Sequence, residues 1–253
     1  MYSNKKVIKM YEQMVEMGNY FSSGRPVYVD PKIIIKDICS KIPLSKNDII
    51  LDVGCGTGLL TIPIARRCKY VYALDAGREI LEKARINCQE GKVRNIVFCE
   101  GLATDLPFKN KLFDRVIMYS VMHYLENMQQ VKNCIQELIR VCKKGGDILI
   151  AEIPEKKAKE EFESREKTSE ELKILEKFKS DRKQYDKLFK EKVSVKPQDN
   201  TLIIDRNILI EIAEKEGCLA KMYKQDIRQP FSLTRRDLVI YRDYFKTCVR
   251  GGS

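Results

Sequence analysis

An aspartate followed by alternating glycines is the feature of this chain best suited to hold a ligand. The stretch LDVGCGTGLL (51–60) places Asp52 two residues before Gly54, and Gly54, Gly56 and Gly58 alternate through the turn. A strand that runs into a glycine-rich turn and then a helix is typical of nucleotide binding, because glycine permits tight turns and the helix start offers unpaired N–H groups. The spacing matches neither the dinucleotide fingerprint G-x-G-x-x-G nor the phosphate loop G-x-x-x-x-G-K-[ST].

Asp52 argues against phosphate groups as the ligand. Its carboxylate would repel a pyrophosphate and would attract a cation. A second acid, Asp75, ends the next apolar run, YVYALD (70–75), where a carboxylate suits the two hydroxyls of a ribose. A nucleoside with ammonium or sulfonium charge in place of phosphates fits both acids, and S-adenosylmethionine is such a molecule.

Five stretches in order resemble the motifs of the class I S-adenosylmethionine-dependent methyltransferases, of the small-molecule type. They are LDVGCGTG (51–58), ALDAG (73–77), GLATDLPF (101–108), FDRVIMYSVMHYL (113–125) and RVCKKGGDILIAEI (140–153). The resemblance covers roughly residues 45–153. It implies an α/β fold with a Rossmann-like, seven-stranded, mostly parallel sheet whose last strand is antiparallel.

The resemblance also implies a set of cofactor contacts. In the family the glycine loop faces the methionine part of the cofactor, the acid after the second strand binds the ribose, and residues after the third strand lie beside adenine. The implied residues are Asp52, Gly54, Cys55, Gly56, Gly58, Asp75, Ala76, Leu102, Ala103, Tyr119 and Ser120. Many relatives read Gly-Asp-Ala where this chain reads Gly101-Leu102-Ala103. Either Asp105 or a backbone carbonyl replaces that aspartate, or the adenine contact is weaker.

His123 is the candidate general base if the methyl acceptor has to lose a proton. It follows the fourth predicted strand, where the pocket should open, and histidine titrates near neutral pH. The alternative interpretation is a ring that packs at the start of the next helix or lines the pocket. Methyl transfer itself needs mainly alignment and the exclusion of water.

The N-terminal segment is expected to cover the pocket, as it does in similar enzymes. Tyr20, Arg25 and Tyr28 are therefore candidates for lid or substrate contacts, and Tyr124, after the fourth predicted strand, is a further candidate. For Tyr11, packing of an amphipathic helix is the preferred interpretation. Cys55 is interpreted as a small buried residue of the glycine loop and not as a nucleophile.

Hydrophobic periodicity predicts alternating strands and helices, which favours βαβ units. The predicted helices are 5–18, 31–42, 58–68, 78–89, 126–142 and 205–216, and the predicted strands are 49–54, 70–75, 95–100, 113–120, 146–153, 218–224 and 237–242. The charged stretch 155–200 predicts one or two amphipathic helices, with a capping box from Thr168 to Glu171. We therefore expect a helical lid (1–44), a cofactor-binding domain (45–154 with 201–253) and a helical cap (155–200).

Composition narrows the class of protein further. The 253 residues carry a net charge of +11, but the lysines are interleaved with acids, which favours a lysine-rich surface over a nucleic-acid-binding face. The nine cysteines form no C-x-x-C pair and there is one histidine, so we expect reduced thiols and no metal site. No apolar run approaches membrane-spanning length and the N-terminus has no signal-peptide pattern, so a cytoplasmic location is expected. The expected oligomeric state is a monomer or a homodimer.

Three functions remain open at this point. The first is S-adenosylmethionine-dependent O- or N-methylation of a small molecule, with C-methylation of a quinone-type ring as a close variant. The second is methylation of RNA or protein, although the end of the fourth strand reads MYSV and not [DN]-P-P-[YFW], and no Pro-Cys dipeptide is present. The third is a protein that binds S-adenosylmethionine without catalysis, because a fold does not set function.

Overall fold

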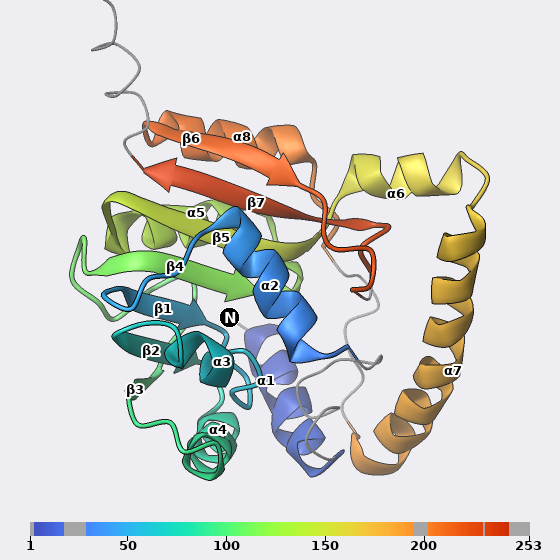
Figure 1. Ribbon diagram of the computed structural model, residues 1–253, viewed down its shortest axis with the longest axis horizontal. Helices are drawn as coiled ribbons and strands as arrows, with labels where there is room; N and C mark the ends of the chain where they lie inside the picture. Colours follow the sequence, from blue (N-terminus) through green and yellow to red (C-terminus); the bar gives the residue numbers. More distant parts are fainter. Residues whose placement is uncertain (1–2, 18–28, 195–201, 230, 243–253) are drawn as a thin grey trace, which may run out of the picture.

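One mixed β-sheet runs through the protein. The computed structural model describes residues 3–17, 29–194, 202–229 and 231–242. Within these ranges the strands form one seven-stranded sheet in the order β3-β2-β1-β4-β5-β7-β6 (Figure 1). The strands are β1 (Ile49–Val53), β2 (Tyr70–Asp75), β3 (Ile96–Glu100), β4 (Phe113–Tyr119), β5 (Cys142–Pro154), β6 (Cys218–Tyr223) and β7 (Arg235–Arg242).

The strand directions confirm the predicted fold class. The pairs β1–β2, β1–β4, β2–β3 and β4–β5 are all parallel. Strand β7 is antiparallel to both of its neighbours, β5 and β6. Among the described strands, β7 alone therefore reverses direction, as predicted for the last strand, and the carboxyl ends of the other six lie at one edge. Ligands of such sheets bind outside that edge.

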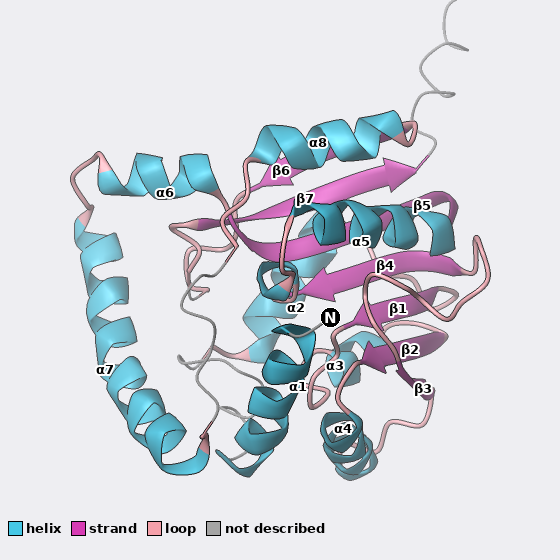
Figure 2. Cartoon of the chain, turned by 180° about the vertical axis from the view of Figure 1, so that it is seen from behind, coloured by secondary structure: helices cyan, strands magenta, loops and turns pink. Residues whose placement is uncertain are grey.

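Helices cover both faces of the sheet. Helices α2 (Pro31–Lys41), α3 (Thr61–Ala65) and α4 (Arg78–Glu90) contribute to the hydrophobic cluster on one face. Helices α5 (Met128–Val141) and α8 (Arg206–Lys215) cover the opposite face of the sheet. Figure 2, turned by 180° from Figure 1, shows this face. This three-layer arrangement explains why the strands read as nearly continuous apolar runs, since both of their faces are buried.

Local sequence signals fix where several helices begin. Asp30 accepts a hydrogen bond from the Lys32 N–H, and Pro31 occupies the first turn of α2, where proline is tolerated. Asn127 caps α5 in the same way. The predicted capping box is confirmed at α7 (Ser169–Lys192), where Thr168 and Glu171 each bond the other's backbone N–H.

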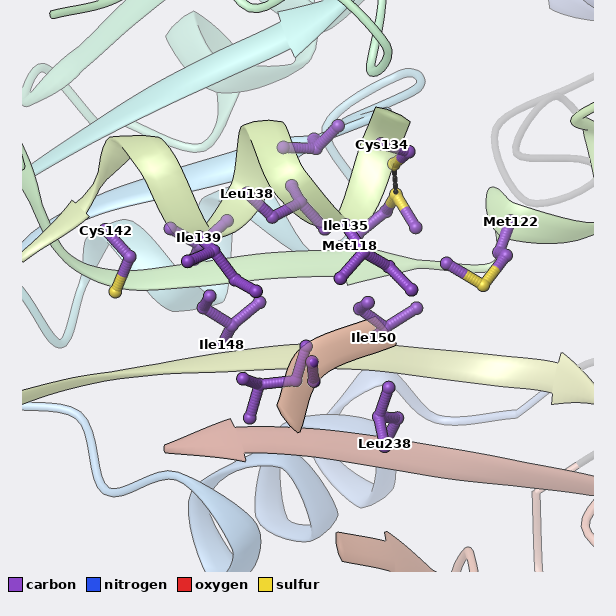
Figure 3. Close-up of a cluster of buried hydrophobic side chains, with 14 of the residues drawn as sticks. Met118, Met122, Cys134, Ile135, Leu138, Ile139, Cys142, Ile148, Ile150 and Leu238 are labelled. Carbon is purple, nitrogen blue, oxygen red and sulfur yellow. Dashed lines mark hydrogen bonds between the residues drawn. The ribbon is translucent and has the colours of Figure 1, made fainter. Parts of the chain in front are cut away.

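The larger part of the core lies between the sheet and helices α5 and α8. Figure 3 shows Ile135, Leu138 and Ile139 of α5 lying over Ile148 and Ile150 of β5. Cys134 and Met118 meet there through their sulfur atoms, 3.6 Å apart. Apolar burial of this extent contributes roughly 25 cal/mol per Å² of buried area, which holds the strand ends at fixed positions.

Three further α-helices lie at the carboxyl edge of the sheet. Helix α1 (Ser3–Met14), continued by the short η1 (Val15–Met17), lies beside α4, and α6 (Lys156–Glu163) leads into the long α7 (Figure 1). The face of α1 that carries Met10 and Met14 packs against Tyr185 and Val193 at the end of the insert. In contrast α2, which the sequence prediction groups with the lid, is buried against the sheet.

Some element boundaries differ from the prediction. The helix predicted for 58–68 is only Thr61–Ala65, because Gly58 has a φ of +86° and lies outside helical geometry. Strand β5 begins at Cys142 and not at 146, since Cys142 already pairs with Phe113 before a register shift. The charged stretch forms two helices, α6 and α7, within the range predicted.

Candidate functional site

A cavity opens at the carboxyl edge of the sheet and collects most of the predicted site. Its walls come from the ends of β1, β2 and β4, the segment after β3, and α1. All residues predicted to contact the cofactor line it except Gly58: Asp52, Gly54, Cys55, Gly56, Asp75, Ala76, Leu102, Ala103, Tyr119 and Ser120. The structure therefore brings together residues that lie up to 68 positions apart in the sequence.

The glycine loop is shaped by its contact with β2. The N–H groups of Gly54 and Cys55 both donate to the Leu74 carbonyl, at 2.7 and 3.0 Å. Gly54 has a φ of +73°, and a Cβ there would lie 2.2 Å from Cγ2 of Val121. A side chain is therefore excluded at Gly54 both by backbone strain and by space. Gly58 instead faces Cys88, away from the cavity wall.

Asp75 ties the glycine loop to the start of α4. Its Oδ2 accepts the Gly56 N–H at 2.9 Å, and its Oδ1 accepts the Gly77 N–H at 3.1 Å. A carboxylate has about four lone-pair positions, so each oxygen can accept one further hydrogen bond. Burial raises the pKa of Asp75 despite these two bonds. Asp75 is thus a fixed acceptor at the cavity wall, suited to a pair of hydroxyl groups.

Asp52 is the more deeply buried of the two acids. It is 3% exposed, and its Oδ2 accepts a 2.6 Å hydrogen bond from the Thr61 hydroxyl. Burial raises the pKa of Asp52 to about 6, the Thr61 bond opposes that shift, and the charge of Asp75 adds to it. A carboxylate whose charge is disfavoured by burial gains most from a cationic ligand. This agrees with the cation preference expected from the sequence.

The end of the cavity beside β3 is mainly apolar. Leu102 is 40% exposed and lies there with Ile80 of α4 and Leu74 of β2. Asp105, one replacement considered for the missing family aspartate, is exposed and does not line the cavity. Thr104 does line it, and the sequence reasoning missed this residue. A hydroxyl next to an apolar wall was not distinguishable by type or spacing from an ordinary turn residue.

The opposite end of the cavity lies at β4 and under α1. Ser120 has a φ of +62°, so the chain leaves β4 through a left-handed residue beside Tyr119. Tyr124 and Tyr11 both line the cavity, and their hydroxyl oxygens are 2.6 Å apart with the rings edge to face. Tyr11 therefore does more than pack a helix. Val7 and Ile8 of α1 complete this wall and were not predicted.

Among the remaining predicted residues, His123 stands apart from the cavity. His123, in η3 (Met122–Tyr124), is buried and does not line the cavity; its ring centroid lies 4.0 Å from that of Tyr124. Tyr20, Arg25 and Tyr28 lie outside the described residues. Burial raises the pKa of the Cys55 thiol well above its usual value, which disfavours a nucleophilic role.

No group of three or more histidine, cysteine, aspartate or glutamate side chains in the described ranges is placed to hold a metal ion. Among the helices that the structure describes, none is both long and apolar enough to cross a membrane.

A doubly wound sheet with a glycine loop after β1 and an acid after β2 defines the class of Rossmann-like nucleoside-binding proteins. Within that class, residues 50–146 match the family described as a methyltransferase domain. This part of the chain is a class I S-adenosylmethionine-dependent methyltransferase domain, and S-adenosylmethionine is the cofactor of that family. The residues at the cavity fit this cofactor, since a glycine loop approaches closely and two buried acids suit a cationic nucleoside.

Curated relatives agree with this assignment over part of their length. A ubiquinone biosynthesis O-methyltransferase of Rickettsia typhi is 33% identical over 157 residues, 59% of this chain and 61% of that protein. A probable cobalt-precorrin-6B C(15)-methyltransferase of Methanocaldococcus jannaschii is 40% identical over 76 residues, 29% of this chain and 42% of that protein. The matched region thus spans less than two thirds of either relative.

Solved structures confirm the fold. Phosphoethanolamine N-methyltransferase 1 of Haemonchus contortus, in complex with S-adenosylhomocysteine, gives a TM-score of 0.65 at 16% identity and covers 94% of this chain and 48% of that one. Magnesium protoporphyrin IX methyltransferase of Synechocystis, also with S-adenosylhomocysteine, gives 0.61 at 16% identity and covers 95% and 100%. At this identity the likeness concerns the fold alone.

Proposed function

We propose that this protein transfers the methyl group of S-adenosylmethionine to an oxygen or nitrogen atom of a small-molecule acceptor. The main observation that supports this proposal is that the glycine loop, Asp52, Asp75 and side chains of α1 all line one cavity. The acids match a cationic ribonucleoside, and the cover by Val7, Ile8 and Tyr11 favours a small acceptor over a polymer. The two curated relatives described above are named for small-molecule reactions. C-methylation of a quinone-type ring remains a variant of this proposal.

The residues of this chain would bind, orient and enclose the reactants. Asp75 would accept the ribose hydroxyls, the apolar wall at Leu102 and Ile80 would take the adenine, and Asp52 would favour the positive charge. When bound, the cofactor supplies an activated methyl group on sulfur, so no further chemical group of the protein is required for displacement. The hydrophobic side chains of α1 would exclude water from the reacting atoms.

A general base enters only if the acceptor must lose a proton. His123 stays a hypothesis for that role, since it is close to Tyr124 but outside the cavity wall. If it is the base, His123→Ala should slow turnover by roughly 10²-fold or more. A turnover rate close to that of the wild type would assign the ring to packing.

Transfer from labelled cofactor tests the proposed function. The purified protein is incubated with methyl-labelled S-adenosylmethionine and a desalted cell extract, small metabolites are added back, and products are separated by size. We expect label in the small-molecule fraction, and less label with the Asp75→Ala variant when the cofactor concentration is below saturation. Label in RNA or protein would replace the small-molecule proposal. Calorimetric cofactor binding with no label in any fraction would favour a binding protein without catalysis.

A further inference from the structure

The wall of the cavity carries little charge, although the chain as a whole is rich in basic residues. The sequence holds 47 lysine and arginine residues, which gives the net charge of +11. Among the described residues that line the cavity there is no lysine, arginine or histidine, and the charged ones are Asp52 and Asp75. A buried anion has to be paired with a cation or with hydrogen-bond donors. The described part of the wall therefore disfavours an anionic ligand.

The strand order gives the two acids to the cofactor and leaves the β4 end of the cavity to the acceptor. The apolar wall lies at β3 and β2, Asp75 ends β2, and the glycine loop follows β1. Strand β4 is next to β1, and the residues that follow it, Ser120 and Val121, line the cavity as well. A nucleoside on the β3–β2 side would therefore leave the β4 end to the second reactant.

The wall at the β4 end is apolar and touches the glycine loop. Val121 packs over Gly54, since its Cγ2 lies 2.2 Å from the position that a Cβ on Gly54 would take. Leu125 is 7% exposed and lines the same end of the cavity. Burial of apolar area against such a wall is favourable, and an unpaired polar group there is costly. This end of the cavity therefore suits the hydrocarbon part of a ligand.

Two tyrosine hydroxyls meet at the same end. The hydroxyl oxygens of Tyr11 and Tyr124 are 2.6 Å apart, and the ring centroids are 5.5 Å apart, edge to face. Both residues line the cavity, Tyr11 from α1 and Tyr124 from η3. A hydroxyl has one proton and two lone pairs, so it can take part in three hydrogen bonds. The pair can bind a hydroxyl or carbonyl group, but it supplies no charge to balance an ion.

The tyrosine pair is held in place from outside the cavity. Both rings pack against a hydrophobic cluster made by Met10, Met14, Met17, Tyr185 and Val193. The centroid of the His123 ring lies 4.0 Å from that of Tyr124. Side chains that are fixed by packing lose little conformational entropy when a ligand binds. The two hydroxyls are therefore oriented in advance, as the selection of a ligand requires.

We propose that the methyl acceptor is an uncharged molecule with an apolar body. Tyr11 and Tyr124 select it by binding one of its hydroxyl or carbonyl groups. An anionic acceptor would meet Asp52 and Asp75 and no cation of the described wall, and a cationic acceptor would be repelled by the sulfonium charge of the cofactor. The carboxylate of the cofactor has its own ammonium group beside it and needs no cation from the wall. This inference rests on the proposed function and names its substrate class.

The charge of the labelled product tests the proposed acceptor class. The transfer experiment described above is repeated, and its small-molecule fraction is divided at pH 7 on anion- and cation-exchange resins. We expect the new label in the part that neither resin retains, and we expect ethyl acetate to extract it. An enzyme-free incubation corrects for breakdown of the cofactor. Label on the anion exchanger, or in a cationic product distinct from the cofactor, would overturn the proposal.

The same experiment separates this inference from the proposed function. Label in RNA or protein, or cofactor binding without label in any fraction, would contradict the proposed function and this inference with it. Label in a charged small molecule would leave the proposed function standing, and the present inference alone would fail.

Two conservative variants test the tyrosine pair with the acceptor obtained in this way. Tyr11→Phe and Tyr124→Phe each remove one hydroxyl and keep the ring. At saturating S-adenosylmethionine we expect the KM for the acceptor to rise about three- to tenfold in each variant, the effect of one lost hydrogen bond, while kcat changes less than twofold. An unchanged KM in both variants would show that the pair does not select the acceptor.

Gln13→Ala is the matched control for an effect of α1 itself. Gln13 belongs to α1 like Tyr11, but its side chain bonds Ser194 and does not line the cavity. This variant loosens the attachment of α1 and leaves the tyrosine pair intact, so the KM for the acceptor should stay within twofold of the wild-type value. A KM raised as much as in Tyr11→Phe would mean that the position of α1 matters and not the hydroxyl, which would overturn the role given to the pair.

Discussion

At the scale of single residues, Asp75 links the shape of the site to ligand binding. Its two oxygens already hold the N–H groups of Gly56 and Gly77, so the carboxylate has one orientation before any ligand arrives. A group that is already oriented loses little conformational entropy on binding. Removing it therefore has two effects: the hydroxyl partner is lost, and the glycine loop loses its tie to α4.

Asp75→Ala should weaken S-adenosylmethionine binding by roughly 1–3 kcal/mol, the range for a lost hydrogen bond to a charged acceptor. Calorimetry on the folded variant measures this. Asp105→Ala is the control, because Asp105 is an exposed acid near the same end of the site and outside the cavity wall. If Asp75→Ala binds S-adenosylmethionine as tightly as the wild type, Asp75 is not part of the binding site. If Asp105→Ala binds it more weakly, Asp105 contacts the adenine after all.

Asp52 predicts a pH dependence of cofactor binding. Burial raises its pKa to about 6 in the unliganded protein, and a bound cation stabilises the ionised form and lowers that pKa. Protons and cofactor then compete below pH 6. The affinity for S-adenosylmethionine should therefore fall by up to about tenfold for each unit by which the pH decreases. Calorimetry between pH 5 and 7.5 tests this. Asp52→Asn should bind more weakly with a flatter profile, and a flat wild-type profile would contradict the assignment.

The residue scale also shows where sequence reasoning succeeds and where it stops. Asp52, the glycines and Asp75 were predictable because their types are unusual at strand ends and their spacing is local. Thr104, Val7 and Ile8 were not, because threonine, valine and isoleucine are ordinary residues whose role depends on distant partners. The buried ion pair of Lys41 and Asp237 has the same limit, since the two residues are 196 positions apart.

At the scale of elements, α1 lies between the cavity and the insert. One side of it contributes Val7, Ile8 and Tyr11 to the cavity wall, and the other packs Met10 and Met14 against Tyr185. The Gln13 side chain also donates to the Ser194 hydroxyl and accepts the Ser194 backbone N–H, just after α7. The insert (155–200) thus packs against the side of α1 that faces away from the cavity. A direct contact between the insert and the methyl acceptor stays a prediction.

Tyr11→Phe should loosen α1 over the cavity. The substitution removes the 2.6 Å hydrogen bond to the Tyr124 hydroxyl, worth about 1 kcal/mol, while the ring stays in place. We expect faster hydrogen exchange in α1 and cofactor dissociation faster by roughly fivefold, if opening of α1 limits release. Hydrogen-exchange mass spectrometry and stopped-flow binding measure the two effects.

Tyr223→Phe is the matched control for this experiment. Tyr223 and Tyr241 form a hydroxyl pair of the same length, 2.6 Å, between β6 and β7, and neither lines the cavity. The control should leave α1 exchange and cofactor dissociation unchanged. The same rates in Tyr11→Phe and the wild type would mean that this hydrogen bond does not hold α1 in place.

At the scale of the whole molecule, the order of strands and helices could be read from the sequence, but the position of the lid could not. Alternation of short apolar runs with helical patterns predicted a mainly parallel sheet, since both faces of each strand must be buried, and the antiparallel last strand followed from the family resemblance. The range 1–44 behaves as two parts, because α1 covers the cavity and α2 joins the core. Hydrophobic periodicity is the same for both helices and does not show which surface each covers.

Two buried carboxylates make the stability of the whole molecule depend on pH. Burial raises the pKa of both Asp52 and Asp237 to about 6, although Lys41 acts against the shift at Asp237. In the unfolded chain both titrate near 3.9. Between pH 4 and pH 6 the folded protein therefore binds more protons than the unfolded chain. The free energy of unfolding must then decrease as the pH rises through this window, by up to about 3 kcal/mol for each group.

Asp52→Asn should remove the contribution of Asp52 to this decrease. The asparagine oxygen can still accept the Thr61 hydrogen bond, so the fold is retained while the titration is lost. Urea unfolding of the unliganded wild type and variant at pH 4.5 to 7 measures the two slopes, and equal slopes would contradict the raised pKa. Saturating S-adenosylmethionine should flatten the wild-type slope and leave the variant nearly unchanged, because the cation favours the charged form of Asp52. Stability and cofactor binding are then linked through one carboxylate at the end of β1.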